Sequence, residues 1–325
     1  MDLLLIQLLN GLVSGAFYAL LALGLALILS LTRIINLAHG GFLVVGAYMG
    51  YVLSGLVGFY WSLLLAPLGL ALLAVILEIS IMRPLYRRDP LESLLLTFGL
   101  ALALEETVRI LFGPVAVPFR IPEGLGSSLF PGTSLFFLTR YRILVLAIAL
   151  MAGLGVYLLL RFTRLGLYLR AGAQDRETLN ALGTDVRRLY TLAFALGAFL
   201  AGLAGVLAAG QLGLSPTMGT GLLMPSFVAL ILGGVGSLGG SYLGGLLVGM
   251  ATGLAGNFLA LASELNDLFE NGYRIITCLE HEKYIRFSPS CFEENGGVVH
   301  CAQGQSVGSK HLAAQALRHL GKALL

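Results

Sequence analysis

Charged side chains gather in one segment of this otherwise apolar chain, RAGAQDRETLNALGTDVRRL, at residues 170–189. Asp175 opens a stretch in which charged and polar residues surround Leu179 and Leu182, and Gly183 follows directly. This pattern predicts a short amphipathic helix that the glycine stops. Two interpretations are open: an ordinary solvated loop, or a helix on which a soluble partner docks.

A second polar insertion, NLAHGG at residues 36–41, separates two apolar runs. Glycines let the backbone turn, and a histidine in water titrates near neutral pH. One interpretation is a helix break in which His39 hydrogen-bonds to a freed backbone carbonyl. The other is a segment that lines or gates a translocation path, with Asn36, His39, Gly40 and Gly41 as the candidate residues.

Few ionisable residues fall within the apolar runs or at their ends, namely Glu78, Glu105, Glu106 and Arg109. Glu105 and Arg109 are four apart, which predicts a pair on one helical face; a place in a transport path is the alternative. An ion-coupled carrier usually places ionisable groups near the membrane midplane. No segment has the P-loop form G-x-x-x-x-G-K-[ST]. We therefore predict no ATPase site, no catalytic residue, no metal and no cofactor in this chain.

The elements that position these residues belong to a membrane. The chain is 57% hydrophobic and only 11% charged, whereas soluble domains carry about 25% charged residues. The first apolar run, from Leu3 to Leu31, is too long for the apolar core of a signal peptide and long enough to span a bilayer. No cleavable signal peptide is expected.

Apolar runs of spanning length predict an all-α, polytopic transmembrane bundle with about eight spans. The predicted spans are Leu3–Leu31, Phe42–Val57, Trp61–Met82, Leu91–Phe112, Ile143–Leu160, Leu189–Leu212, Leu222–Val235 and Tyr242–Ala262. Two of them are short and rich in glycine, Phe42–Val57 and Leu222–Val235, and the second contains Pro225. These two are expected to be broken or re-entrant helices, which protein or a water-filled cavity must satisfy.

Arginines set the expected orientation. One group follows the third span and a larger group lies between the fifth and sixth spans, which counting places on the same side. The positive-inside rule makes that side cytoplasmic. The N-terminus and the proline-rich segment 113–141 are then outside.

Small residues recur at every fourth position, which predicts close packing between helices. They are Gly11 and Gly15; Gly236, Gly240 and Gly244; and Ala201, Gly205 and Ala209. Residues 12–50 and 192–240 are also weakly alike, each a long apolar run followed by a short glycine-rich one. Internal repeats of this kind are common in transporter folds.

The composition changes near Glu264, which divides the chain into residues 1–263 and an atypical charged tail at 264–325. The first 264 residues contain no lysine, and all three cysteines lie in the tail. Three explanations of the tail are open: a frameshift or rearrangement at the end of the gene, a genuine appended domain, or an interaction tail. The spacing of its cysteines and histidines matches no strong zinc template.

Three segments, in this order, resemble the membrane permease of branched-chain amino-acid ABC importers, the LivH type. They are NGLVSGAFYALLALGLALILSLTRIINLAHGGFLVVGAYM at 10–49, RAGAQDRETLNALGTDVRRLYTLAFALGAFLAGLAGVL at 170–207 and LILGGVGSLGGSYLGGLL at 230–247. The resemblance runs from about residue 4 to residue 262, the predicted transmembrane permease domain. The family continues with another apolar span near Glu264, and this chain departs from the family there.

The resemblance implies a subunit that forms the translocation path in the bacterial plasma (inner) membrane as a multi-pass protein. Its implied partners are cytoplasmic ATP-binding subunits, a second identical or homologous permease subunit, a periplasmic or lipid-anchored substrate-binding protein and membrane lipid, with no nucleic acid. The segment Ala173–Gly183 would be the coupling helix. Its candidate residues are Ala173, Gln174, Asp175, Arg176, Glu177, Leu182 and Gly183.

Alternative functions are an ion-coupled secondary transporter or channel for small polar solutes, and a membrane scaffold. The substrate of an importer stays open among branched-chain amino acids, other amides and urea. Co-purification separates these classes, because only an importer permease brings soluble ATPases with it.

Overall fold

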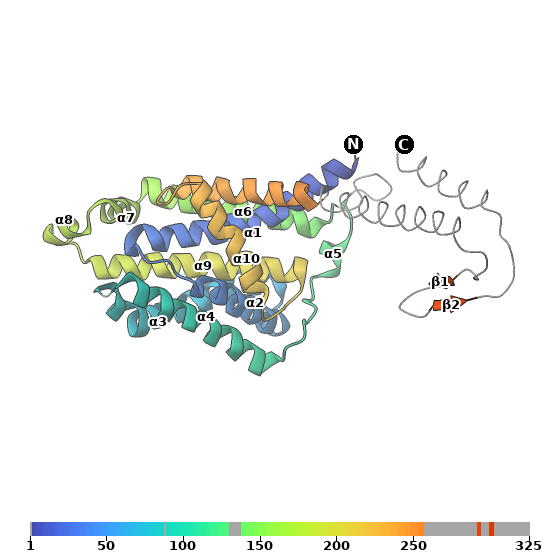
Figure 1. Cartoon of the computed structure of the whole chain (residues 1–325). Helices are drawn as coiled ribbons and strands as arrows, with labels where there is room; N and C mark the ends of the chain where they lie inside the picture. Colours follow the sequence, from blue (N-terminus) through green and yellow to red (C-terminus); the bar gives the residue numbers. More distant parts are fainter. Residues whose placement is uncertain (1, 88, 130–137, 257–290, 294–298, 302–325) are drawn as a thin grey trace, which may run out of the picture. The chain divides into compact units, whose positions relative to one another are not determined.

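The computed structural model describes residues 2–87, 89–129, 138–256, 291–293 and 299–301. The chain divides into two compact units, Met1–Leu259 and Ala260–Leu325. The first unit is a bundle whose long helices run side by side (Figure 1). In the second unit, strands β1 (Cys291–Glu293) and β2 (Val299–Cys301) pair antiparallel. The sequence predicts no zinc site in the tail. The cysteines and histidines on which that prediction depends lie mostly outside the described residues.

Helices form at each of the eight predicted spans, as far as the chain is described. The elements are α1 (Asp2–Thr32), α2 (Ala38–Val57), α3 (Phe59–Leu77), a π-helix η1 (Glu78–Met82), a 3₁₀-helix η2 (Arg83–Arg87), α4 (Pro90–Phe112), α5 (Glu123–Gly126), α6 (Arg140–Phe162), α7 (Arg164–Gln174), α8 (Arg176–Ala181), α9 (Val186–Leu212) and α10 (Met218–Leu232). A further helix, Leu238–Gly256, follows α10. The prediction of a polytopic helical bundle is confirmed.

Among the described residues, six helices are long and apolar enough to cross a membrane: α1, α2, α3 with η1, α6, α9 and Leu238–Gly256. Helix α4 has 23 residues, but it carries four charged side chains. Leucines on the outer faces of α3, α4 and α6 are exposed, for example Leu72, Leu95 and Leu154. Apolar side chains on the outside of a bundle are what a lipid environment accommodates.

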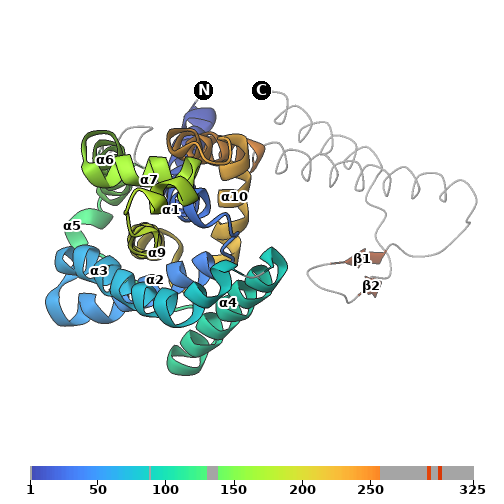
Figure 2. The same ribbon diagram turned by 90° about the vertical axis from the view of Figure 1, so that its left-hand side faces the viewer.

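Helix α9 lies at the centre of the bundle, surrounded by neighbouring helices when viewed end-on (Figure 2). It packs against α1, α2 and α3, and small residues make this approach close. A Cβ atom on Gly205 would lie 2.2 Å from the carbonyl oxygen of Leu43 on α2. The predicted packing role of Gly205 is therefore confirmed, since any larger side chain would separate the two backbones.

Helix α1 packs against Leu238–Gly256 through glycines on both helices. A Cβ atom on Gly11 would lie 2.6 Å from the carbonyl oxygen of Gly249, and one on Gly15 would lie 3.0 Å from Leu246. The partner stripe is Gly245, Gly249 and Gly253. The spacing predicts the α1 glycines correctly but not this second stripe, which lies one residue out of step with Gly240 and Gly244.

The chain breaks between α1 and α2. Arg33 adopts a left-handed backbone with φ of +56° directly after α1, a conformation that more often belongs to glycine. Helix α2 then begins at Ala38, earlier than the predicted Phe42. Helix α10 has 15 residues with Pro225 inside it, which fits the prediction of a short, irregular span.

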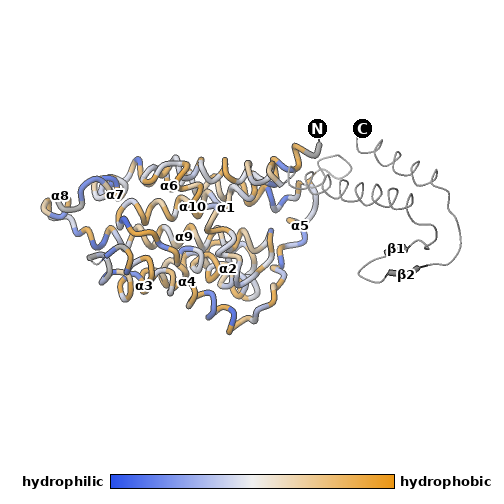
Figure 3. Tube along the Cα trace, viewed as in Figure 1, coloured by the Kyte–Doolittle hydropathy of each residue, from blue (hydrophilic) through white to orange (hydrophobic). Residues whose placement is uncertain are grey.

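Polar residues collect at the ends of the bundle, most clearly around α7 and α8 (Figure 3). The two arginine-rich connections share one end, because Arg83 after η1 donates a hydrogen bond to Thr191 on α9 at 2.8 Å. The prediction that both connections lie on one side of the bundle is confirmed. Their assignment to the cytoplasm stays a prediction from the positive-inside rule.

Candidate coupling segment and translocation path

The predicted coupling helix is two helices with a break between them. Helix α7 ends at Gln174 and α8 covers only Arg176–Ala181. Ala173 and Gln174 thus belong to α7, and Asp175 lies between the helices. The expectation of one helix over Ala173–Gly183 is wrong, because Asp175 has an extended backbone (φ −146°, ψ 102°) that ends α7. We call residues 164–185 the α7–α8 segment.

Both ends of α8 are closed by local hydrogen bonds. The backbone N–H of Thr178 donates to Oδ1 of Asp175 at 3.1 Å, so Asp175 is an N-cap. At the other end, the N–H of Thr184 donates to the carbonyl of Leu179 and the N–H of Gly183 donates to that of Asn180. With φ of +85° at Gly183, this is a Schellman arrangement. The predicted glycine stop is confirmed.

One leucine fixes α8 to the bundle. Leu179 is buried, and its side chain converges with those of Leu31 and Leu189 on Gly172. A Cβ atom on Gly172 would lie 3.1 Å from Leu31 and 3.3 Å from Leu179. Leu182, in contrast, is 76% exposed. The segment therefore presents an apolar side chain outward while an inward one holds it in place.

A cavity of about 210 Å³ lies beside this segment. Its lining is mostly apolar and comes from α1, α6, α7 and the turn after α10: Leu27, Ser30, Leu31, Leu160, Leu169, Arg170, Ala173, Gln174, Gly236 and Leu238. Two of the predicted coupling residues, Ala173 and Gln174, are among them. The cavity shows that α7 is not tightly packed against α1 along its whole length.

The predicted path or gate residues, Asn36, His39, Gly40 and Gly41, are all buried. Oδ1 of Asn36 accepts the N–H of Ala38, the first residue of α2, at 3.1 Å. Within the described part of the chain, the amide nitrogen of Asn36 and both ring nitrogens of His39 have no hydrogen-bond partner. The ring lies next to the backbone of Leu21 in α1, so both interpretations of His39 stay predictions.

Three helices meet around His39. A Cβ atom on Gly24 of α1 would lie 2.8 Å from Nε2 of His39 and 2.9 Å from the carbonyl oxygen of Gly197 on α9. The next residue in α2, Gly40, contacts α10, because a Cβ on Gly219 would lie 2.3 Å from the Gly40 carbonyl oxygen. The glycine-rich helices of the two predicted repeats, α2 and α10, thus begin next to each other inside the bundle.

The predicted pair of Glu105 and Arg109 does not form. Instead, Nη1 of Arg109 lies 3.2 Å from Oε2 of Glu106, one turn away, and both side chains are partly exposed. Residues three apart are as close on a helix as residues four apart, so spacing alone left both partners open.

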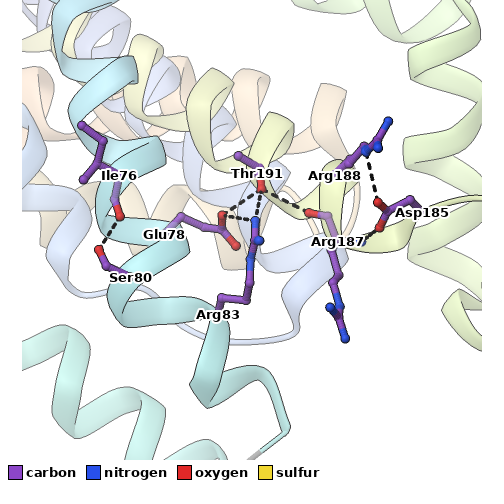
Figure 4. Close-up of polar contacts among 8 residues, drawn as sticks. All are labelled: Ile76, Glu78, Ser80, Arg83, Asp185, Arg187, Arg188 and Thr191. Atoms are coloured by element: carbon purple, nitrogen blue, oxygen red, sulfur yellow. Dashed lines mark hydrogen bonds and ion pairs between the residues drawn. The ribbon is translucent and has the colours of Figure 1, made fainter.

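Glu78, a candidate ionisable residue from the sequence, has partners that spacing along the chain did not predict. This carboxylate is fully buried, and its Oε2 lies 3.1 Å from Nη2 of Arg83 and 2.8 Å from Oγ1 of Thr191 (Figure 4). The Tyr86 ring packs against that of Tyr190 with centroids 4.9 Å apart. Burial raises the pKa of the Tyr86 phenol, and the Glu78 carboxylate raises it further.

Comparison with known proteins identifies the family. The model of the family described as "Branched-chain amino acid transport system / permease component" matches residues 7–276. This chain belongs to that family. The match extends beyond residue 262, where the resemblance was expected to end. The family assignment also fits a transport subunit rather than an enzyme.

Relatives with curated names cover most of this permease. The branched-chain amino acid permease protein LivH of Salmonella typhimurium is 28% identical over 287 residues, which cover 84% of this chain and 92% of the relative. BraD of Pseudomonas aeruginosa is 30% identical over 260 residues, 75% and 84% of the two chains. LivM of Escherichia coli is 30% identical over 245 residues, 68% and 57%.

Proposed function

We propose that this chain is the membrane-spanning permease subunit of an ATP-driven importer for branched-chain amino acids in the bacterial plasma (inner) membrane. The observation that carries the proposal is the α7–α8 segment, in a chain that belongs to this permease family. It is capped at both ends of α8, anchored by Leu179, and exposes Leu182 among polar residues. Such a surface suits a soluble partner that pushes on the bundle.

Cytoplasmic ATP-binding subunits are the partner we assign to this surface, and the permease itself carries no ATPase site. The residues assigned to coupling are Ala173, Gln174, Asp175, Arg176, Glu177, Leu182 and Gly183. A second permease subunit would complete the path. Both LivH and LivM are similar to this chain, which supports a pair of related subunits as well as a pair of identical ones. A substrate-binding protein outside the membrane would deliver the amino acid.

We propose that residues 36–41 gate the translocation path. Helix α2 begins within this range, and the start of α10 packs against it inside the bundle. Asn36 and His39 bring hydrogen-bonding groups that have no partner among the described residues, and such groups are costly in an apolar interior. A second conformation in which water or substrate hydrogen-bonds to these groups would recover the free energy that their burial costs. Gly40 and Gly41 let neighbouring helices approach at this point.

Co-purification tests the proposal. The permease, expressed from its own gene neighbourhood, should bring ATP-binding subunits with it. Leu182→Asp should reduce their recovery at least fivefold, because a charge replaces the apolar side chain at the proposed interface. Exposed Val115, in the connection after α4, provides a control, since Val115→Asp should leave the recovery unchanged. Equal recovery with Leu182→Asp and wild type would contradict the assignment of this surface.

A further inference from the structure

A polar cluster around the buried Glu78 ties η1, at the end of α3, to the start of α9, next to the α7–α8 segment. Glu78 accepts hydrogen bonds from Arg83 and Thr191 through Oε2, and Arg83 also donates to Oγ1 of Thr191 at 2.8 Å. The three side chains close a triangle in which each contacts the other two (Figure 4). We call Glu78, Arg83 and Thr191 the latch.

The backbone of η1 is shaped to form this triangle. Pro84 has no N–H, so it cannot donate to the Ser80 carbonyl as a regular helix requires. The chain instead closes over five residues, with the N–H of Arg83 donating to the carbonyl of Glu78. A π-helical turn brings residues five apart to nearly the same side, which a regular α-helix does not. Glu78 and Arg83 therefore face α9 together.

The side chain of Glu78 contacts neither lipid nor water, because it is 0% exposed, whereas that of Arg83 is 34% exposed. A buried ion pair contributes little net stability compared with apolar packing, but removing one partner leaves a charge that is poorly solvated. The ion pair itself lies within residues 78–83, and the hydrogen bonds of Glu78 and Arg83 to Thr191 make the link to α9. These bonds fix a relative position more strictly than leucines would, because apolar contacts have no fixed direction.

A short, capped connection and a shared packing site join the latch to the α7–α8 segment. Gly183 ends the Schellman turn, Asp185 caps α9, and Thr191 lies in the second turn of that helix. Leu189, in the same part of α9, contacts the niche at Gly172 where Leu179 of α8 is anchored. A displacement of α8 must therefore move the start of α9.

We propose that the latch transmits this displacement from α9 to α3, which makes Glu78, Arg83 and Thr191 positioning residues for the coupling of ATP hydrolysis to transport. The inference rests on the proposed importer function. Neighbouring Tyr86 and Tyr190 pack beside the triangle and restrict its access to water. When the latch is intact, η1 and the start of α9 move as one body. When it is broken, the start of α9 moves without η1 and ATP is hydrolysed unproductively, while the packed middles of α3 and α9 stay together.

The test measures leucine transported per ATP hydrolysed. The permease is reconstituted in proteoliposomes with its ATP-binding subunits and its substrate-binding protein. Thr191→Val removes the hydroxyl but keeps both charges, and Glu78→Gln removes the carboxylate charge. Both should lower the ratio at least fivefold while the ATP-binding subunits are recovered at wild-type levels. Thr191→Ser should restore the ratio to within twofold of wild type.

Glu106→Gln is the matched control, because it breaks a partly exposed ion pair with Arg109 on α4. Its ratio should equal that of wild type. A wild-type ratio in both Thr191→Val and Glu78→Gln would overturn the latch. Absence of any ATP-dependent uptake in the wild type would instead overturn the proposed importer function, so the two failures are distinguishable.

A second measurement does not depend on ATP. Spin labels are placed at exposed Ile79 and Leu182 in a full-length chain whose three tail cysteines are replaced by serine. Thr191→Val should at least double the width of the distance distribution, and Thr191→Ser should leave it at the wild-type width. An unchanged width in Thr191→Val would overturn the mechanical link, whether or not transport is observed.

Discussion

Two polar segments interrupt this apolar chain, and the structure treats them in opposite ways. In the α7–α8 segment the polar groups form local hydrogen bonds, and Asp175 and Gly183 close the two ends of α8. In the break at residues 36–41, Asn36 and His39 are buried with hydrogen-bonding atoms that have no partner in the described residues. The first arrangement suits a rigid surface that receives a push. The second suits a place where the bundle changes its internal contacts.

The buried break should tolerate added volume least. Gly219→Ala puts a Cβ atom 2.3 Å from the Gly40 carbonyl oxygen, so the start of α10 must shift away from α2. We expect a loss of about 3 kcal/mol of stability, measured as detergent-solubilised protein that survives heating. Gly221→Ala is the control on the same helix, since a Cβ there meets open space. Equal melting temperatures of the two variants would contradict the claim that α10 packs closely at Gly219 and loosely at Gly221.

The anchor of the α7–α8 segment should rank next. Leu179→Ala removes a buried side chain that contacts the niche at Gly172, and we expect a cost of about 2 kcal/mol. Hydrogen exchange of the α8 amides should accelerate more than that of α9. Leu182→Ala, at an exposed leucine of the same segment, should change stability by less than about 0.5 kcal/mol. Faster exchange in both variants would mean that α8 is not held by Leu179.

Loss of the α8 cap should have a smaller effect. Asp175→Ala removes the acceptor of the Thr178 N–H and should cost about 1 kcal/mol of stability. Asp175→Asn keeps an acceptor oxygen and should stay close to wild type. Thermal melting of both variants gives the comparison, and an Asn variant as unstable as the Ala variant would indicate that charge, not capping, is what Asp175 contributes.

The smallest effect on stability is expected at His39. His39→Leu replaces a ring whose nitrogens have no partner among the described residues, so stability should change by less than about 1 kcal/mol or increase. Transport by the reconstituted complex should fall at least fivefold if residues 36–41 gate the path. A variant that melts and transports like wild type would reduce the break to helix packing.

Much of the fold could be predicted because apolar runs and glycines act locally. The spans, the glycine stop at Gly183 and the packing at Gly11, Gly15 and Gly205 all follow from residue type and spacing. The break at Asp175 was missed because an extended residue within a polar stretch has no clear sequence signal. The predicted partner of Arg109, Glu105, is wrong for a similar reason, because two glutamates lie within reach of Arg109 on the same helix.

The latch could not be predicted from spacing. Glu78 and Thr191 are 113 residues apart in sequence, and only the packing of α3 against α9 brings them together. The available signal was weaker: a carboxylate at the end of an apolar run, an arginine five residues later and Pro84 directly after it. These residues indicate a broken helix end, but they do not name the helix that it faces.

ATP-dependent uptake tests the central claim most directly. Proteoliposomes containing the permease, its ATP-binding subunits and its binding protein are given radiolabelled leucine, with and without ATP. An ATP-driven importer should accumulate leucine only with ATP, and this accumulation should persist when ionophores collapse the proton and sodium gradients. Accumulation without ATP that disappears with the ionophores would contradict this expectation and favour an ion-coupled carrier.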